Sequence, residues 1–396
     1  MFSELSKFVE ENRMEINNKK TKCMIFNKTG KYLRRSYMLR NETLYTTNSY
    51  KYLGFLITPS GEIASGLNDL KERALRAYFS LKNKLGHYFG RFPSTTTSLF
   101  DSLVKPILLY NSDFWGCLKM PQNNPIENVY MKFCKELLGV QKQTTNIGVL
   151  LELGKTPIML NAKKNCIKNW CRIHKKKMAN AIVLKAHKTS IENNLPWPTA
   201  VKNCLNGIGI GSESNITDIV IDSESDITDI PTAAFEKLKD IFHQESFFAI
   251  SNEESKLRTY AKLKTSIGME KYLDLIVNTD ERAAISKIRL SNHDLMIEKG
   301  RHQKPTLKKE LRFCPFCKNE VETEQHFILK CNTFNPIRTH FMMEIGRISP
   351  RFKHMDEHEK FVYLLTNENT VHVVGNYLHR ALQSRRFLTQ YHKNNE

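Results

Sequence analysis

Four residues near the C-terminus have the types and the spacing of a metal site. Cys314 and Cys317 are separated by two residues, so both sulfurs can reach one metal ion across a tight turn, which Pro315 favours. His326 and Cys331 follow, about one helical turn apart, and can supply the other two corners of a tetrahedron. Three thiolates and one imidazole make a closed structural zinc site that leaves no position open for catalysis. The sequence therefore predicts one structural Zn²⁺ bound by these four residues.

The chain has nine cysteines. Those outside this motif show no comparable spacing and are predicted to be buried and to behave as small hydrophobic residues. An odd number of cysteines scattered over a long chain does not indicate a disulfide framework. The first residues have neither the basic nor the apolar region of a secretory signal, and no stretch approaches the roughly 20 apolar residues that span a bilayer. We therefore expect an intracellular protein of the nucleus or cytoplasm, with reduced thiols and no membrane partner.

The segment that leads into the metal site is basic and contains aromatic residues. Its cations are Lys287, Arg289, Lys299, Arg301, Lys304, Lys308, Lys309 and Arg312, and its aromatic residues are Phe313, Phe316 and Phe327. Cations for phosphates and aromatic faces for unpaired bases are the combination that binds single-stranded nucleic acid. Arg301 and Arg312 are therefore candidate nucleic-acid contacts. The phenylalanines could equally form a small core around the metal, and for Phe327 we favour that interpretation.

The charge balance points to a polyanionic partner. Sixty Lys and Arg against 41 Asp and Glu give a formal net charge of +19 over 396 residues, a length that suggests two or three domains. Residues 161–190 hold nine Lys or Arg and no acid, beside a helical stripe of apolar residues. An ordinary solvated helix face is the alternative, but the absence of acids favours a surface that follows phosphates. The candidate contacts there are Lys168, Arg172, Lys175 and Lys176.

The N-terminal part alternates strand and helix patterns. We expect a helix over residues 2–12, a strand over 22–26 and a second strand over 50–58 that ends at Pro59-Ser60-Gly61. An amphipathic helix follows with Leu67, Leu70, Ala74, Tyr78, Leu81 and Leu85 on one stripe. A further helix is predicted to begin near Ser94–Thr97, which can cap it, and to break at Pro106.

The second half reads as helical after an acidic linker. Residues 190–232 include a short duplication, 212–219 and 223–230, and are predicted to be a flexible linker. Helical patterning resumes at 233–250 and again from Asp280, where Thr279 can cap a helix. The last fifty residues are also helical in character.

Several blocks of the sequence resemble the reverse transcriptases of non-LTR (LINE-type) retrotransposons. Residues 5–26 (LSKFVEENRMEINNKKTKCMIF) resemble the segment just after the catalytic hairpin of that family, and residues 50–58 (YKYLGFLIT) resemble its primer-grip strand pair. The thumb helices are matched by 71–78 (KERALRAY) and 103–110 (LVKPILLY). Residues 286–293 (SKIRLSNH) and 298–302 (EKGRH), followed by the Cys/His knuckle, resemble the C-terminal region. The blocks occur in the family's order.

The resemblance implies roles for matching positions. A lysine of the cluster that contains Lys20 and Lys22 would lie near the phosphates of an incoming nucleotide, although these lysines could simply flank a turn. Tyr52 and Gly54 match the primer grip, where glycine permits close approach of the backbone to the primer end. On the thumb-like helix, the cations that we expect to contact nucleic acid are Lys71, Arg73 and Arg76.

The departures from the family concern catalysis. A polymerase needs paired carboxylates to hold two Mg²⁺ ions. In the family these aspartates precede the Lys-Thr-Lys segment, whereas the residues that precede it here contain no Asp. No catalytic residue is therefore predicted, and Mg²⁺ would bind only if a missing upstream reverse transcriptase region completed the site.

The resemblance implies an α+β fold: a short antiparallel palm remnant with thumb helices, then a mostly α-helical C-terminal region with a small zinc knuckle. The expected divisions are 1–60 (palm remnant and primer-grip-like strands), 61–120 (thumb-like helices), 121–189 (basic helices), 190–232 (linker), 233–304 (helical region), 305–340 (zinc knuckle) and 341–396 (helical tail). The expected function is binding of RNA and DNA, a retrotransposon transcript and its target, as a C-terminal fragment of the reverse transcriptase. The alternatives are a retrotransposon-derived host protein that binds nucleic acid or protein without enzymatic activity, and a product of a truncated element copy.

Overall fold

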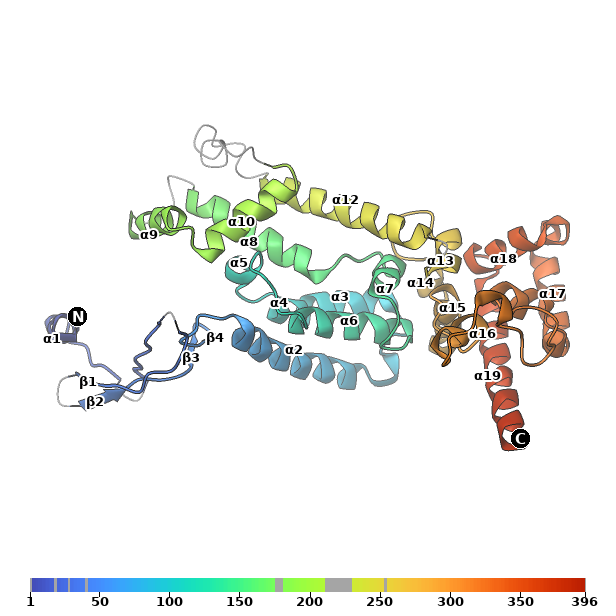
Figure 1. The fold of residues 1–396 in the computed structure, drawn as a ribbon, viewed down its shortest axis with the longest axis horizontal. Coiled ribbons are helices and arrows are strands. Elements are labelled where there is room, and N and C mark those ends of the chain that lie inside the picture. The colour runs from blue at the N-terminus through green and yellow to red at the C-terminus, as the bar shows by residue number, and fades with distance from the viewer. Residues whose placement is uncertain are drawn as a thin grey trace.

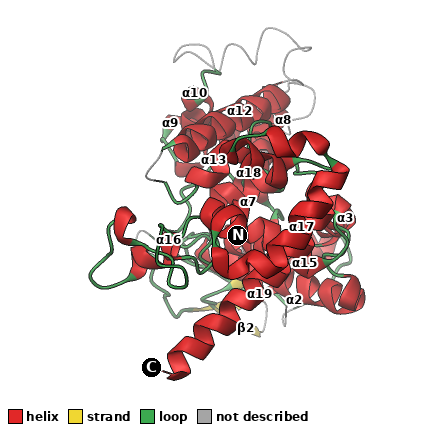
Figure 2. Cartoon of the chain, turned by 90° about the vertical axis from the view of Figure 1, so that its right-hand side faces the viewer, coloured by secondary structure: helices red, strands yellow, loops and turns green. Residues whose placement is uncertain are grey.

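The computed structural model describes residues 2–17, 20–27, 29–39, 42–174, 181–210, 230–252 and 255–395. Those residues are mostly helical, with two small antiparallel sheets of two strands each, in agreement with an α+β class. Figure 1 shows the two sheets near the N-terminus at one end of an elongated molecule, and the C-terminal helices at the other. The view from the C-terminal end in Figure 2 shows that helices predominate in the described part of the chain. No described helix is long and apolar enough to cross a membrane.

The N-terminal segment contains one helix and two hairpins. Its elements are α1 (Phe2–Glu11), β1 (Ser36–Leu39), β2 (Glu42–Tyr45), β3 (Tyr50–Tyr52) and β4 (Phe55–Ile57). The expected helix at 2–12 is confirmed as α1. The expected strand at 22–26 is wrong, because that segment makes a single bridge, from Cys23 to Thr46. The first hairpin, β1 with β2, was not predicted.

The stretch expected to be one strand over 50–58 is a hairpin, in which Tyr50 lies opposite Ile57 and Tyr52 opposite Phe55. The chain reverses at Leu53 and Gly54, whose φ angles are +45° and +82°. Two successive residues of positive φ form the kind of two-residue turn that matches the twist of paired strands. The single strand that the apolar pattern predicted over 50–58 is therefore wrong, and two short strands take its place.

The hairpin packs on α2 (Ala64–Leu85), the longest helix of the N-terminal half. Leu67, Leu70, Ala74, Tyr78 and Leu81 are buried on one face, as the spacing predicted. A Cβ added at Gly66 would overlap the ring of Phe55, so glycine lets β4 lie directly against the helix. This contact attaches the small sheet to the helical body.

The next helices follow the expected break at proline. They are α3 (Pro93–Leu103), α4 (Lys105–Leu108), α5 (Ser112–Trp115), α6 (Pro125–Leu138) and α7 (Asn146–Glu152). The chain changes direction at Val104, and Pro106 stands in the first turn of α4, where its missing N–H costs nothing. Ser94 does not cap α3. It lies inside the helix and donates its N–H and hydroxyl to the carboxylate of Asp274.

A second, smaller core is built from the basic helices. It joins α8 (Ile158–His174), α10 (Pro196–Gly207) and the first part of α12 (Ile230–Ser251), and α9 (Ala181–Glu192) lies beside them. Ile167, Trp170 and Cys171 are buried in it, as their stripe predicted. The expectation of a flexible linker over 190–232 is wrong for Pro196–Gly207, because these residues form α10, which packs on α8. The duplicated acidic segments lie, except for Ile230, outside the described residues.

The C-terminal third is helical, as expected. Its α-helices are α13 (Arg258–Leu263), α14 (Tyr272–Leu275), α15 (Thr279–Arg289), α16 (Met296–Lys299), α17 (Asn335–Ile348), α18 (Glu357–Thr366) and α19 (Val371–Asn395). Short 3-10 turns lie at η1 (Gly86–Tyr88), η3 (Gly300–His302), η4 (Lys309–Leu311), η6 (Asn332–Phe334) and η7 (Pro350–His354). The side chain of Asn278 caps α15, one residue earlier than the expected Thr279. Asn278 accepts hydrogen bonds from the N–H groups of Asp280 and Glu281.

The main hydrophobic core is continuous from Phe55 to Ala381. It includes α2, α6 and α7 as well as Phe327 of the metal-site segment and Leu378 of α19. Residues of the expected ranges 61–120, 121–189, 233–304, 305–340 and 341–396, together with Phe55 of the first range, therefore share one core in the structure.

Candidate metal centre

The ligand atoms of Cys314, Cys317, His326 and Cys331 all lie within 4.8 Å of one another. The sulfurs of Cys314 and Cys331 are 3.7 Å apart, and the sulfur of Cys317 is 3.4 Å from Nε2 of His326. In a tetrahedral site with Zn–S of about 2.3 Å and Zn–N of about 2.05 Å, the edges measure about 3.8 Å and 3.6 Å. These two separations are close to the edges of such a tetrahedron, so the cluster could hold a metal ion such as zinc.

A tight loop places the first two ligands. The N–H of Cys314 donates to the carbonyl of Glu320 at 2.8 Å, and the N–H of Lys318 donates to the carbonyl of Cys314 at 2.9 Å. Phe313 and Val321 face each other in an antiparallel bridge at the base of the loop. Lys318 adopts a φ of +58°, which reverses the chain just after Cys317. The loop thus turns both thiols toward the same point.

A π-helical turn, His326–Lys330, places the other two ligands. The N–H of Cys331 donates to the carbonyl of His326 at 2.9 Å. In an α-helix at about 100° per residue, two positions five apart would point about 140° away from each other. The wider π turn bonds residue five back to residue zero and so brings the two side chains to one side. The predicted spacing was correct, but the structure uses this wider turn to satisfy it.

Glu320 orients the histidine from outside the cluster. Its Oε2 lies 3.2 Å from Nδ1 of His326, so Nε2 is left to face the sulfurs. A histidine that donates Nδ1–H to a carboxylate keeps a lone pair on Nε2 for a metal ion. Sequence reasoning missed Glu320, because three glutamates, Glu320, Glu322 and Glu324, lie between the two ligand pairs and nothing in the sequence distinguishes Glu320 from the other two.

Hydrogen bonds within the cluster shift the pKa values of Cys314, His326 and Cys331. The hydrogen bond between the two thiols lowers the pKa of Cys331 to about 3 and raises the pKa of Cys314. Burial lowers the pKa of His326, but hydrogen bonds with Cys331 and Glu320 outweigh it and raise the pKa to about 9. A metal ion in place of the shared protons would hold the sulfurs as thiolates, and its binding would release protons. Such a site is structural, because all four corners are protein atoms.

The centre is embedded in the main core. Phe327 is fully buried, and its ring lies 4.9 Å from that of Phe334, which confirms Phe327 as a core residue. Tyr377 of α19 donates to the carbonyl of Ile328 at 3.1 Å, and the guanidinium of Arg338 donates to the carbonyl of Cys331. The metal segment is therefore held from two C-terminal helices, α17 and α19.

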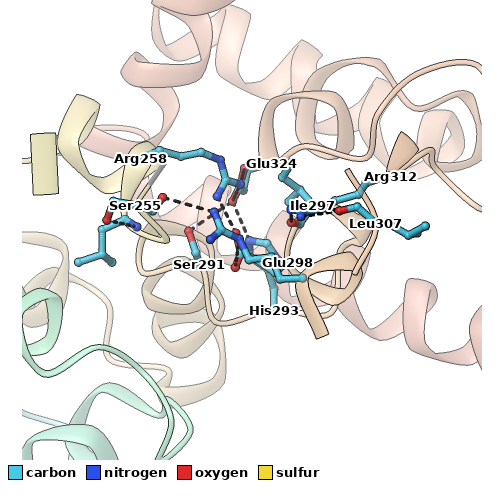
Figure 3. A network of polar contacts seen from close by, with 11 residues as sticks. Ser255, Arg258, Ser291, His293, Ile297, Glu298, Leu307, Arg312 and Glu324 are labelled. Atoms are coloured by element: carbon cyan, nitrogen blue, oxygen red, sulfur yellow. Dashed lines mark hydrogen bonds and ion pairs between the residues drawn. The ribbon is translucent and has the colours of Figure 1, made fainter. Parts of the chain in front are cut away.

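Two buried glutamates between the ligand pairs add ion pairs. Glu322 forms two hydrogen bonds of 2.7 Å each with Arg385 of α19. Glu324 accepts from Arg258 at 3.1 Å and pairs with His293 at 3.0 Å, and Arg258 also donates to Glu298 at 2.6 Å. Figure 3 shows Arg258 of α13 beside Glu324 and Glu298. Removing one member of such a network would leave a charge buried and unpaired, which is costly.

Part of the basic segment that precedes the site is structural. Arg289 is fully buried, where it pairs with Glu152 at 2.7 Å and Glu270 at 2.6 Å. Arg312 is also buried, and its guanidinium donates to the carbonyls of Ile297 and Leu307, as Figure 3 shows. Arg301 lies 3.4 Å from Glu298. The side chain of Arg312 therefore binds backbone carbonyls inside the protein, whereas the sequence suggested a surface contact with nucleic acid.

The predicted contacts near the N-terminus lie partly together. Lys22 and Tyr52 line one hollow of about 240 Å³, along with Met24, Phe26, Thr47, Tyr50 and Ile57. Lys20 is exposed in a turn and does not line that hollow. The backbone of Gly54 lies against the ring of Tyr110, and its carbonyl accepts from Arg73 at 2.8 Å. In this structure the group that lies close to the backbone of Gly54 is therefore the ring of Tyr110.

The basic positions on α2 and α8 are mostly at the surface. Arg76 is exposed, while Lys71 lies 3.7 Å from Glu72 and Arg73 lies 3.4 Å from Asp69. Lys168 and Arg172 are exposed on α8 and line a hollow of about 280 Å³. Lys175 and Lys176 lie outside the described residues.

Comparisons with known proteins add no relative: no family model, curated protein or solved structure matches this chain. What stands is a basic, mostly helical protein with a three-cysteine, one-histidine cluster that could hold a metal ion such as zinc.

Proposed function

We propose that this chain binds RNA or single-stranded DNA as the C-terminal part of a non-LTR retrotransposon reverse transcriptase, with the Cys/His centre as its structural zinc site. Catalytic carboxylates are not part of the proposal. The binding role follows from the charge of the chain and from the surfaces described below.

The observation that carries the proposal is the hollow between residues 22–26 and 50–57. Lys22 stands there beside three aromatic rings, and two of them, Phe26 and Tyr52, are 61% and 57% exposed. Exposed aromatic faces beside a cation suit unpaired bases and their phosphates, whereas a folded chain gains nothing by leaving such rings in water. The two segments are also those that resemble the post-catalytic segment and the primer grip of the family.

The basic face of α8 supports the same role. Lys168 and Arg172 line a hollow together with Asn165, Asn169 and one acid, Asp113, and neither cation forms an ion pair with an acid among the described residues. Arg172 is held by the side chain of Asn169 at 2.8 Å, which fixes the guanidinium at the surface. Cations that are not neutralised within the protein remain available to phosphates.

The test is titration of a labelled single-stranded RNA and a matched DNA, followed by fluorescence anisotropy. The double variant Lys22→Glu with Tyr52→Ala should bind about tenfold more weakly or worse, because one stacked base contributes about 1–3 kcal/mol. The control is Lys31→Glu with Tyr45→Ala. It makes the same chemical changes at an exposed lysine and at a tyrosine that is 61% exposed, neither of which lines the hollow.

Salt dependence gives a second measurement. If six to ten phosphates are contacted, the affinity of the wild-type chain should fall roughly 10³- to 10⁵-fold between 50 and 200 mM salt. Equal affinities of the hollow variant and its control would remove the hollow from the interface. Absence of binding by the wild-type chain at low salt would overturn the proposed function.

A further inference from the structure

The C-terminal helices form a groove of about 840 Å³, much larger than the hollows near the N-terminus. It lies between α17, η7 and α18, beside the π-helical turn of the metal centre, which contributes Leu329. Its apolar lining includes Met342, Met343 and Phe352. Met343 is 53% exposed, so about half of this groove-lining methionine is accessible to solvent.

Cations surround this apolar lining. Arg347, Lys353 and Lys360 line the groove, and among the described residues none of them forms an ion pair. Lys360 lies over the ring of Phe352, with its ammonium 5.9 Å from the ring centre. The one acid among the lining residues, Glu357, is paired with Lys330 at 2.9 Å. The groove therefore carries an excess of positive charge that the protein itself does not neutralise.

A buried arginine ties the groove to the metal segment. Arg338 is 5% exposed, lines the groove and donates through one end of its guanidinium to the carbonyl of Cys331. Its Nε has no hydrogen-bond partner among the described residues. A buried donor without a partner is costly, so an acceptor on a ligand would remove an existing penalty.

We infer that this groove binds a short stretch of single-stranded nucleic acid, with Arg347, Lys353 and Lys360 on its phosphates and Met343 against an unpaired base. The inference rests on the proposed nucleic-acid-binding function and assigns it a second surface. A cavity of this size fits one or two nucleotides, and a polarizable thioether is a suitable contact for the flat face of a base. A duplex would offer its phosphates to the cations but no base face to Met343.

The test compares two triple variants of the full chain for binding to labelled single-stranded RNA, single-stranded DNA and a duplex. The groove variant is Arg347→Glu, Lys353→Glu and Lys360→Glu. The control makes the same type of charge reversal at three exposed lysines that do not line the groove: Lys84→Glu, Lys119→Glu and Lys142→Glu. Zinc content and thermal unfolding of each variant establish that it is folded.

The groove variant should bind single strands at least about tenfold more weakly than the control, and its log–log salt slope should be smaller by about 2, since each phosphate contributes about 0.7. Met343→Ser should weaken single-strand binding several-fold while the salt slope stays unchanged. Met38→Ser, at a methionine of 60% exposure on β1, is its control and should bind like wild type.

The outcomes separate the two proposals. If the wild-type chain binds no oligonucleotide, the proposed function fails and this inference fails with it. If wild type binds but the groove and control variants bind alike, the groove inference alone is overturned. Loss of binding to a poly-glutamate peptide with unchanged oligonucleotide binding would also overturn it, because the groove would then be a site for acidic peptides. An equal loss for duplex and single strand would overturn the base contact.

Discussion

Glu320 should control the affinity of the metal centre without being a ligand. Replacing Glu320 by Gln keeps the length of the side chain and removes its charge. In the structure its Oε2 lies 3.2 Å from Nδ1 of His326, on the side of the ring away from the sulfurs. The substitution therefore leaves the four ligand atoms in place and changes only how well the imidazole is held and polarised.

The expected effect is about a tenfold loss of zinc affinity. Loss of a carboxylate behind a ligating histidine costs about 10- to 100-fold in metal affinity, or about 1.4–2.7 kcal/mol. The lower end applies here, because the Glu320 side chain is 52% exposed and water screens its charge. Lys330, 3.9 Å from the same oxygen, further weakens the negative charge that His326 experiences.

The assay is competition for zinc between the full chain and a chromophoric chelator at fixed pH. Glu357→Gln is the matched control, because Glu357 has a similar exposure of 56% and pairs with the same Lys330, at 2.9 Å. It does not contact His326 in the described contacts. Both variants lose one negative charge near the site, so a general electrostatic effect would appear in both.

The result that refutes this reasoning is equal zinc affinity in the Glu320→Gln and Glu357→Gln proteins. The Glu320→Gln protein should still bind one zinc per chain when zinc is in excess. If its stoichiometry falls to zero, Glu320 does more than orient the histidine, and the tetrahedral assignment needs revision.

Three further outcomes are expected. The purified chain should contain one zinc, and Cys314→Ala with Cys317→Ala should abolish it while Cys23→Ala leaves it unchanged, as metal analysis would show; equal zinc in all three proteins would mean misassigned ligands. Burial raises the pKa of Glu136, but hydrogen bonds with Lys132, Lys82 and Tyr78 outweigh it and lower the pKa to about 2. Because the folded-state pKa is depressed, this stabilisation is present above the unfolded value near 4.5 and is lost as pH falls toward 2. Denaturant unfolding of wild type should therefore lose roughly 1–2 kcal/mol more than Glu136→Gln between pH 5 and 2, and parallel curves would contradict it. Finally, the isolated chain should not extend a primer on a template with dNTPs and Mg²⁺ or Mn²⁺; template-dependent extension above a buffer control would show that catalytic carboxylates were overlooked.

The sequence alone was sufficient for features that depend on neighbours along the chain. The stripe from Leu67 to Leu81 predicted the buried face of α2, since helical periodicity is a local property. Pro106 predicted the break between α3 and α4 for the same reason. The spacing of Cys314, Cys317, His326 and Cys331 also predicted that these side chains gather in one cluster, because thiol and imidazole groups at such short spacings are typical of metal sites.

Turns that depend on rare backbone angles could not be predicted from the sequence. Residues 50–58 have the apolar, β-branched and aromatic composition of one strand, yet Leu53 and Gly54 fold them into a hairpin. A leucine at positive φ has no local reason for that conformation. Tyr110, 57 residues further along the chain, donates to the carbonyl of Leu53 and so helps to hold the turn.

The role of each cation was decided by the tertiary structure. Arg289, Arg312 and Arg347 are equivalent in a count of charge along the sequence. Folding places Arg289 against Glu152, which is 137 residues away, and turns Arg312 toward backbone carbonyls. It leaves Arg347 at the edge of a groove without an ion-pair partner among the described residues. The amino-acid composition therefore showed that the chain is basic. It could not show which cations remain free to bind phosphates. That depends on the acids and carbonyl groups that the fold brings beside each cation, because ion pairs and hydrogen bonds form between groups that are close in space.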